Sequence, residues 1–491
     1  MIDISFCFEV HQPTRLNGDF FWGGSLLKTV YPDLFNVYFD RSEDQKIFDR
    51  ISTKCYLPTN EVILNAIRKF ESSEKPFKVA YSFSGIFVDQ CIKYRPDVLD
   101  SFVVLADTGM MEVMEQTYYH SLTSLFEDKD EFKEQVKMHR ELMWDIFGLR
   151  PIVFENTELL YNNEIAKLVE NMGYKAIFTE GVVADPNYVY RPKDLEICLL
   201  LRNYQLTDDI GFRFSSRWWE EYPLTADKYA SWLAAAPGHC INIFCDYETF
   251  GEHQWLETGI FEFLRHLPEE VLRHQNLRFA TPSEIVRNNE PLDEINVERT
   301  ISWADLERDT SCWLGNALQH ACFIYLRKLE GPVKESLDPI LLKIWRQLGL
   351  SDHLYYLFTH GGGPGEVHSY FSPYRHPYDA AITYLSILTD FHYRLKERLN
   401  LADEPFRFAI GLDKFTGLSA WSLEALCREL AKVELESIEF HMNRGDLASW
   451  AKMSLGDEKL AIEIKRGMGL KGDALRKWLL KVAQSRLEEK S

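Results

Sequence analysis

Three acidic residues follow one apolar run of the sequence, and a fourth follows another. The run "INIFCDY" at 241–247 leads into "DYETFGEH", which contains Asp246, Glu248 and Glu252. Glu158 stands in "NTEL" at 156–159, just after the run "IVFEN". When two carboxylates from separate strands meet in one cleft, one can act as a nucleophile and the other as an acid and base, as hydrolysis of a glycosidic bond requires. Glu158 and Asp246 are therefore the candidate catalytic pair.

Each of these acids, and one histidine, also has a structural interpretation. Glu158 can be an acid of a loop that lies near the N-terminus of a helix, and its spacing in the sequence does not distinguish this structural role from a catalytic one. Asp246 leaves a buried strand, where an unpaired charge is costly, so a functional role is favoured. Glu248 lies two residues further on and can orient or bind a ligand, whereas Glu252 can cap the helix that follows. His11, in "VHQP" at 10–13, fits either a structural hydrogen bond or a contact with a substrate hydroxyl.

Short β-branched or aromatic runs recur between helical patterns along the first part of the chain. They cover residues 4–10, 78–84, 152–156, 176–180, 198–204, 241–247 and 277–281. These runs are mostly apolar on both faces, which indicates parallel strands covered by helices. Gly148 is placed to end one helix, Asn162 to begin another, and Thr281 with Glu284 to form a capping box. Residues 1 to about 285 are thus predicted to form an α/β barrel or a doubly wound sheet, with the active site at the carboxyl ends of the strands.

The pattern changes twice in the rest of the chain. Helical periodicity dominates 303–330, 336–349 and 377–399, and such helices need an apolar surface to cover, most simply that of the barrel. From about residue 405 the sequence resembles a small α/β or α+β module that ends in charged helices. We therefore expect a catalytic barrel at 1–285, a helical bundle that completes the cleft at 286–400, and a small C-terminal domain of unassigned role at 405–491.

Composition limits the classes of function. The net charge of −20 and the lack of a Lys/Arg-rich run argue against nucleic acid as a ligand. No apolar stretch approaches the roughly 20 residues that span a bilayer, and "MIDISFCFEV" lacks the features of a secretory signal, so we expect a cytoplasmic protein with no membrane partner. The nine cysteines include no C-x-x-C pair, which favours reduced thiols over disulfides or zinc. Composition says nothing about the oligomeric state.

Five ordered stretches together resemble glycoside hydrolase family 57, and specifically its α-amylase branch. They are "HQP" at 11–13, "GMMEV" at 109–113 followed by "TYYHSL", "FENTELLYN" at 154–162, "DYETFGEHQ" at 246–254 and "SDHLYY" at 351–356. The stretches "SWADLERDTSCWLGN" at 302–316 and "YFSPYRHPYDA" at 370–380 resemble further segments of that branch. The resemblance covers about residues 1 to 400, and the tail resembles a small uncharacterised domain that accompanies the branch.

The resemblance implies a fold and a mechanism. It implies an incomplete (β/α)7 barrel followed by a helical bundle, acting on α-1,4-glucans such as glycogen, starch and maltooligosaccharides with retention of configuration and without a metal or other cofactor. Glu158 matches the family's nucleophile and Asp246 its acid/base. A basic residue is more often expected at the position of Glu155, so an extra acid beside the nucleophile is a departure. The substrate-binding residues that we predict, from the motifs and from nearby aromatic residues, are His11, Gln12, Trp22, Glu112, Trp219, Glu248, His253, Asp352 and Tyr355.

Other functions stay open at this point. A 4-α-glucanotransferase or a branching enzyme would use the same two carboxylates and differ only in whether water or a sugar hydroxyl attacks the intermediate. A metal-dependent polysaccharide deacetylase or mannosidase would need Asp and His ligands at a strand end, and no His-x-Asp or His-x-x-x-His arrangement supplies them there. A non-catalytic glucan-binding protein is the more remote alternative.

Overall fold

The computed structural model describes residues 1–22, 34–359 and 372–490. They form two compact units, one of residues 1–323 and 349–384 and the other of residues 324–348 and 385–491. The chain passes between the units at three points, two of them within the helices α13 (Ala317–Lys328) and α18 (Pro377–Leu399) and the third after Leu348, where α15 (Pro339–Leu348) ends. The predicted domain boundaries remain predictions.

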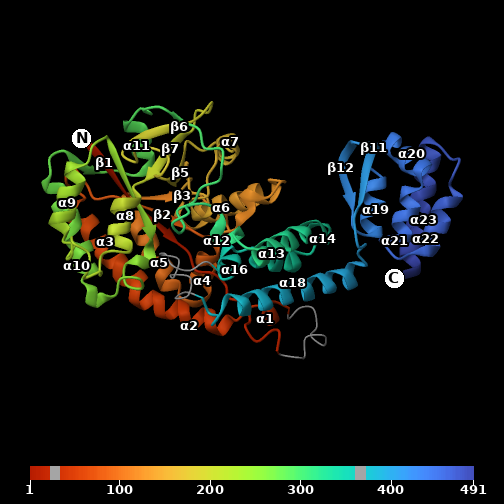
Figure 1. Ribbon diagram of the computed structural model, residues 1–491, viewed down its shortest axis with the longest axis horizontal. Coiled ribbons are helices and arrows are strands. Elements are labelled where there is room, and N and C mark those ends of the chain that lie inside the picture. Colours follow the sequence, from red (N-terminus) through yellow and green to blue (C-terminus); the bar gives the residue numbers. More distant parts are fainter. Residues whose placement is uncertain (23–33, 360–371, 491) are drawn as a thin grey trace. The chain divides into compact units, whose positions relative to one another are not determined.

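Seven parallel strands form the centre of the first unit (Figure 1). They are β1 (Ile2–Val10), β2 (Val79–Phe83), β3 (Met111–Met114), β4 (Val153–Phe154), β5 (Ala176–Glu180), β7 (Cys198–Arg202) and β8 (Cys240–Asp246). Parallel pairing runs from β3 through β2, β1, β8, β7 and β5 to β4. A parallel bridge between Glu115 and Phe154 then joins the end of β3 to β4. The ring is nearly closed, and the predicted (β/α)7 barrel is confirmed.

One member of the ring differs from the sequence prediction. The run at 277–281 becomes β9 (Leu277–Phe279), which pairs with residues 2–4 of β1, on the side that β2 occupies further along that strand. The ring contains β3 in its place, a four-residue strand that the search for apolar runs did not find because "MEVM" is short and contains an acid. Two further short strands, β6 (Val189–Pro192) and β10 (Glu294–Ile295), extend the sheet beside β7.

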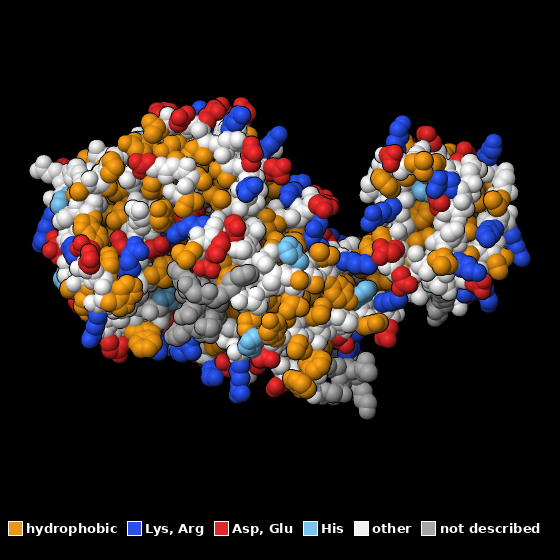
Figure 2. All heavy atoms as spheres, viewed as in Figure 1, with side chains coloured by type: hydrophobic (Ala, Val, Ile, Leu, Met, Phe, Trp, Pro, Cys, Tyr) orange, Lys and Arg blue, Asp and Glu red, His pale blue; other side chains and the backbone are white. Residues whose placement is uncertain are grey.

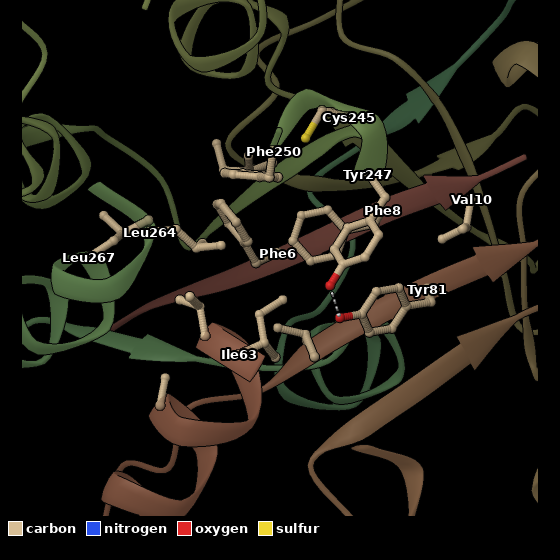
Figure 3. Packing of buried hydrophobic residues seen from close by; sticks show 14 of the residues in the cluster. Phe6, Phe8, Val10, Ile63, Tyr81, Cys245, Tyr247, Phe250, Leu264 and Leu267 are labelled. Atoms are coloured by element: carbon tan, nitrogen blue, oxygen red, sulfur yellow. Dashed lines mark hydrogen bonds between the residues drawn. The ribbon is translucent and has the colours of Figure 1, made fainter. Parts of the chain in front are cut away.

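Side chains of β1 alternate between the inside of the barrel and the surrounding helices. Cys7 belongs to the inner cluster, with residues of β2, β3, β4, β5 and β8. Phe6 and Phe8 belong to the outer cluster, where the ring of Phe8 lies 5.2 Å from that of Tyr81 and 4.9 Å from that of Tyr247 (Figure 3). This outer aromatic layer fixes β1, β2 and β8 against the helices. By the same alternation, Glu9 points inward at the carboxyl end of β1.

Helices follow most of the strands of the first unit and cover the barrel. They are α1 (Leu34–Tyr38), α2 (Arg41–Ile51), α3 (Leu57–Phe70), α4 (Gly85–Tyr94), α5 (Pro96–Asp107), α6 (Asp130–Phe147), α7 (Asn163–Asn171), α8 (Tyr204–Gly211), α9 (Ala226–Ala235), α10 (Ile260–Arg273), α11 (Pro282–Asn288), α12 (Ser311–Leu314) and α16 (Ser351–Tyr355). The predicted helix ends are confirmed: Gly148 ends α6 with φ 65°, the Asn162 side chain caps α7, and the Thr281 capping box begins α11.

The second unit has its own apolar core. It contains α14 (Glu330–Glu335), α15 (Pro339–Leu348), the hairpin of β11 (Phe406–Gly411) and β12 (Lys414–Ala420), and the helices α19 (Leu423–Leu430), α20 (Leu435–Arg444), α21 (Asp446–Met453), α22 (Glu458–Arg466) and α23 (Gly472–Lys490). The Trp421 backbone N–H donates to Glu335, so α14 packs within this unit. On the described part of the face drawn in Figure 2, acidic and basic side chains are interspersed within each unit. All nine cysteines are free thiols.

Candidate active site

A cavity of about 650 Å³ lies within the first unit and is lined by residues at the carboxyl ends of the barrel strands. Side chains that follow β1, β4 and β8 line it, together with residues 303–305, Asp352, Tyr355 and Tyr356. Eight of the predicted site residues come together in this cavity: Glu158, Asp246, His11, Gln12, Glu248, His253, Asp352 and Tyr355.

Glu158 lies on a left-handed turn in the loop after β4, four residues beyond the end of that strand. Its backbone has φ 59° and ψ 27°, a conformation that residues other than glycine seldom adopt. The Trp303 indole N–H donates to one carboxyl oxygen at 2.7 Å, and His120 Nε2 lies 3.3 Å from the other. The Ser302 hydroxyl donates to the Glu158 carbonyl at 2.8 Å. These contacts fix the turn and orient the carboxyl, whose side chain keeps 23% exposure to the cavity.

Asp246 is the last residue of β8 and enters the cavity beside Glu9 of β1, its partner in the strand register. Burial and, secondly, the charge of Glu158 raise the pKa of Asp246 to about 7, against the opposing charges of Arg202 and His120. Asp246 can therefore carry a proton near neutral pH and give it to a group in the cavity.

Arg202, at the end of β7, is the buried cation beside Asp246. Its guanidinium donates to the Phe244 carbonyl at 2.8 Å, to Glu180 at 3.0 Å and to Asp208 at 2.8 Å. A fixed guanidinium with these partners cannot swing toward Asp246 to neutralise it, so its charge acts on the acid from a constant position.

A second group of hydrogen bonds holds His11. The Ser84 hydroxyl lies 2.7 Å from His11 Nδ1, and Asp352 lies 2.9 Å from Nε2. Burial and the charge of His120, whose ring stacks on His11 at 4.1 Å, lower the pKa of His11. Burial alone would raise the pKa of Asp352, but His11 and the charge of His120 hold it well below its usual range. The consistent arrangement is a neutral His11 that donates from Nε2 to an ionised Asp352 and accepts from Ser84.

The Glu248 side chain is almost fully buried and is hydrogen-bonded. The Tyr56 hydroxyl donates to its carboxyl, and so does Gln12 at 3.3 Å. Burial and the charge of Asp246 raise the pKa of Glu248 to about 8. Burial also lowers the pKa of His253 to about 4, so this histidine is neutral near pH 7. Glu248 and His253 are therefore better suited to hydrogen-bond sugar hydroxyls than to interact with the substrate as charged groups.

Three predicted substrate-binding residues lie elsewhere. Trp22 is 78% exposed and is not among the residues that line the cavity. Trp219 packs on Trp232 outside the barrel, with ring centroids 6.1 Å apart. Glu112 accepts the Ser283 backbone N–H at 3.0 Å, two residues before the carboxyl end of β3.

Several lining residues were not predicted. His120 and Trp303 stand within motif stretches that were recognised, "TYYHSL" and "SWADLERD", but neither stretch by itself says that its ring contacts Glu158. Glu9 and Arg202 each occupy the end of an apolar run, where a charged residue is a signal that could have been used. Trp255, 54% exposed, lines the cavity in a loop that carries no sequence signal beyond its distance from Asp246.

Metal ligation has no ready candidate in the described part of the chain: no three His, Cys, Asp or Glu residues are grouped there in a way that could hold an ion. Likewise, among the described residues, none of the helices combines the length and the apolar character needed to cross a membrane.

Comparison with known proteins identifies the class of this barrel and its acidic cavity. Residues 5–298 match the family model of glycosyl hydrolase family 57. The chain is 48% identical over 411 residues to a protein of Methanocaldococcus jannaschii named as a putative alpha-amylase, and the match covers 81% of this chain and 85% of that one. The chain therefore belongs to glycosyl hydrolase family 57, and it is a glycoside hydrolase.

Solved structures share the fold at low sequence identity. One is a 4-alpha-glucanotransferase of Thermococcus litoralis, with a TM-score of 0.58 and 15% identity; the match covers 85% of this chain and 62% of that one. Another is a family 57 branching enzyme of Thermococcus kodakaraensis, with a TM-score of 0.57 and 14% identity, covering 81% of this chain and 90% of that one. At these identities the likeness concerns the fold.

Proposed function

We propose that the chain cleaves α-1,4-glucosidic bonds of glycogen, starch or maltooligosaccharides by a retaining mechanism, with Glu158 as the nucleophile and Asp246 as the acid/base. The observation that carries the proposal is a single cavity that contains both residues in different settings. N–H groups from Trp303 and His120 hold the Glu158 carboxyl, whereas burial raises the pKa of Asp246 to about 7. A pair of carboxyls whose environments differ in this way divides into one nucleophile and one proton donor.

The steps follow from these settings. Asp246 gives its proton to the glycosidic oxygen as the bond to the anomeric carbon breaks, and Glu158 attacks that carbon from the opposite face. Asp246, now ionised, then takes a proton from water, which displaces Glu158 from the glycosyl-enzyme. The carboxyls of a retaining pair are expected about 5–5.5 Å apart, because no water has to fit between acid and sugar in the first step.

The stereochemistry of azide rescue tests this division of roles. With an α-linked aryl maltooligoside, Glu158→Ala should be inactive alone and give the inverted β-glycosyl azide when azide is added. Asp246→Ala should form the glycosyl-enzyme and give the retained α-glycosyl azide. The opposite products would exchange the two roles. If neither variant loses turnover, both assignments are wrong, and binding without turnover in the unmodified chain would favour the glucan-binding alternative.

A 4-α-glucanotransferase or branching activity is the second candidate, and the rim of the cavity supports it. Phe212 and Trp255 are each about half exposed and line the cavity, and a hydrogen bond of 2.8 Å from Gln254 to the Gly211 carbonyl joins their two loops. Trp255 lies in the loop after β8, the strand that ends at Asp246. The rings of Phe212 and Trp255 are therefore placed to stack on a sugar that replaces water as the acceptor of the glycosyl group. Incubation with maltopentaose decides between the two: only shorter products indicate hydrolysis, longer α-1,4 products indicate transfer, and new α-1,6 branches indicate branching.

A further inference from the structure

Residues 302–308 form a closed turn ahead of α12. The Ser302 backbone N–H donates to the Arg308 carbonyl at 3.1 Å, so the two ends of the turn meet. Asp305 and Arg308 have φ values of 54° and 49°, in the left-handed region that residues other than glycine seldom adopt. Such a conformation persists only where the surrounding contacts hold it. Because Trp303 and Asp305 line the cavity, the contacts that hold this turn also shape the wall of the cavity.

The first half of the 302–308 turn rests on Glu158. The Ser302 hydroxyl and the Trp303 backbone N–H donate to the Glu158 carbonyl at 2.8 Å and 3.4 Å. The Trp303 indole N–H donates to the Glu158 carboxyl at 2.7 Å. A displacement of the turn would therefore move a hydrogen-bond donor of the candidate nucleophile.

Arg308, the last residue of the turn, attaches it to the barrel. Its guanidinium donates to Glu180, the last residue of β5, and to Asp208 of α8 at 3.4 Å. The same guanidinium lies 4.5 Å from the centre of the Tyr204 ring, also on α8. Since the Arg308 carbonyl accepts the Ser302 N–H, these contacts hold both ends of the turn.

Arg202 and Arg308 share the same two carboxylates. Glu180 Oε2 accepts from both guanidiniums, and Asp208 accepts from Arg202 on one oxygen and from Arg308 on the other. Glu180 is fully buried, and its second oxygen accepts the Gly181 backbone N–H at 2.6 Å, so both oxygens act as acceptors and the carboxyl is ionised. The two cations and two anions balance, and loss of Arg308 would leave an excess of buried negative charge.

This group of four charges also reaches Trp303 directly. The Arg202 guanidinium lies over the Trp303 ring, 5.6 Å from its centre, and the centre of the Phe244 ring is 5.5 Å away. Arg308 is thus connected to the indole by two routes, one through the backbone of the turn and one through Arg202, with which it shares Glu180.

We propose that Arg308 is a positioning residue that holds the 302–308 turn against β5 and α8 and so keeps the Trp303 N–H on the Glu158 carboxyl. Arg308 itself is not among the residues that line the cavity, so it acts through the turn. The part of this inference that concerns activity rests on the proposed role of Glu158. The part that concerns the position of Trp303 does not.

NMR of the indole N–H groups tests the position without turnover. In protein labelled at the tryptophan indole nitrogens, Trp303→Phe assigns the Trp303 resonance by its disappearance, and Glu158→Ala shows where that proton resonates once its acceptor is gone. In Arg308→Ala the resonance should move upfield toward the Glu158→Ala position, because the hydrogen bond is lengthened or lost. An unchanged resonance in Arg308→Ala would overturn the proposal.

Two further variants guard this test. Arg278→Ala is the matched control, since Arg278 also donates to a buried carboxyl, that of Asp3, but near the amino end of β1 and away from the cavity. It should lower the melting temperature and leave the Trp303 resonance in place. Arg308→Lys keeps the charge and makes one contact instead of two, so it should move the resonance in the same direction by less, and it decides the question if Arg308→Ala does not fold.

The role in activity has a separate readout. On an aryl maltooligoside, Arg308→Ala should lower kcat about 10- to 100-fold, the cost of a slightly misplaced reacting group, with little change in KM. Arg278→Ala should keep both constants. If Arg308 acts through Trp303, the two losses should not multiply, and the double variant Arg308→Ala/Trp303→Phe should be about as active as the weaker of the two single variants.

Losses that multiply in the double variant would show that Arg308 does not act through Trp303. A displaced Trp303 resonance with unchanged kcat would reject the role in activity, and an equal loss of kcat in Arg278→Ala would make the effect one of stability alone. If the chain turns over no glucan at all, the proposed function fails, while the NMR result still decides whether Arg308 positions Trp303.

Discussion

The coupling between Glu158 and Asp246 can be measured without turnover. Glu158→Gln removes the charge that, after burial, contributes most to the raised pKa of Asp246. The substitution preserves the shape of the side chain and still accepts a hydrogen bond from Trp303 or His120. The pKa of Asp246 should therefore fall from about 7 toward its ordinary value without reaching it, because burial persists.

The size of the fall follows from electrostatics. Two carboxylates that flank one sugar lie about 5 to 9 Å apart. At an effective dielectric constant of about 20, unit charges at such distances interact by about 2 to 3 kcal/mol. This energy corresponds to about 1 to 2.5 pKa units. The midpoint of Asp246 in Glu158→Gln is accordingly expected between about pH 4.5 and pH 6, the remainder reflecting the burial of the carboxyl.

Carbon-detected NMR of aspartate-labelled protein gives this midpoint, and Asp246→Asn assigns the resonance by its disappearance. Glu131→Gln, which changes a buried carboxyl on α6, should leave the midpoint near pH 7. An unchanged midpoint in Glu158→Gln would show that the two carboxyls do not sense each other and would refute a shared reaction centre. A midpoint near pH 4 in the unmodified chain would refute Asp246 as the proton donor.

Three further predictions concern the cavity and its chemistry. Trp303→Phe keeps a ring beside Phe244 but removes the N–H that donates to Glu158. A hydrogen bond to a charged group is worth about 1.5–3 kcal/mol, so kcat/KM should fall about 10- to 150-fold with little change in melting temperature. A fall in melting temperature that accompanies the loss of kcat/KM would show that Trp303 has a structural role. Trp255→Ala should raise KM about 2- to 12-fold, from a ring contact of about 0.5–1.5 kcal/mol, while Trp218→Ala, which is 84% exposed and does not line the cavity, should not. Treatment with a chelator should leave kcat/KM unchanged, and a loss restored by a divalent ion would favour the metal-dependent deacetylase or mannosidase chemistry.

The sequence predicted the barrel well because the signal for buried parallel strands is local. Apolar runs such as 4–10 and 241–247 need no knowledge of their neighbours, and both became ring strands. The strand β3 was missed because four residues with an acid among them do not form an apolar run. The run at 277–281 was predicted to be a strand and is one, but its place beside the first residues of β1 depends on strand pairing, which a local pattern does not contain.

The same distinction applies to the candidate site. Glu158 and Asp246 could be selected because each follows a strand of the barrel. Trp303 could not, because its contact with Glu158 depends on how the chain returns to the barrel after residue 300. Trp219 was chosen for its type, yet it packs on Trp232 outside the barrel, since an aromatic ring serves an apolar core as well as a sugar.

The acids of the cavity can be buried close together because their hydrogen-bond partners and their pKa values differ. N–H donors gather at two of them: Trp303 and His120 at Glu158, and His11 at Asp352. Asp246 receives no such donor among the described residues, and burial raises its pKa to about 7.

Glu248, Glu9 and Glu155 extend this pattern. Burial raises the pKa of Glu248 and of Glu155 to about 8, and burial with the charge of Glu155 raises the pKa of Glu9 well above its ordinary value, so these groups bind protons more readily than an ordinary carboxyl does. Had all of them been ionised, their mutual repulsion in a poorly solvated space would oppose folding. Of the acids compared here, Glu158 and Asp352 are the ones whose charge N–H donors stabilise. Under the proposed mechanism, that leaves one anion at Glu158 to attack the sugar and one transferable proton at Asp246.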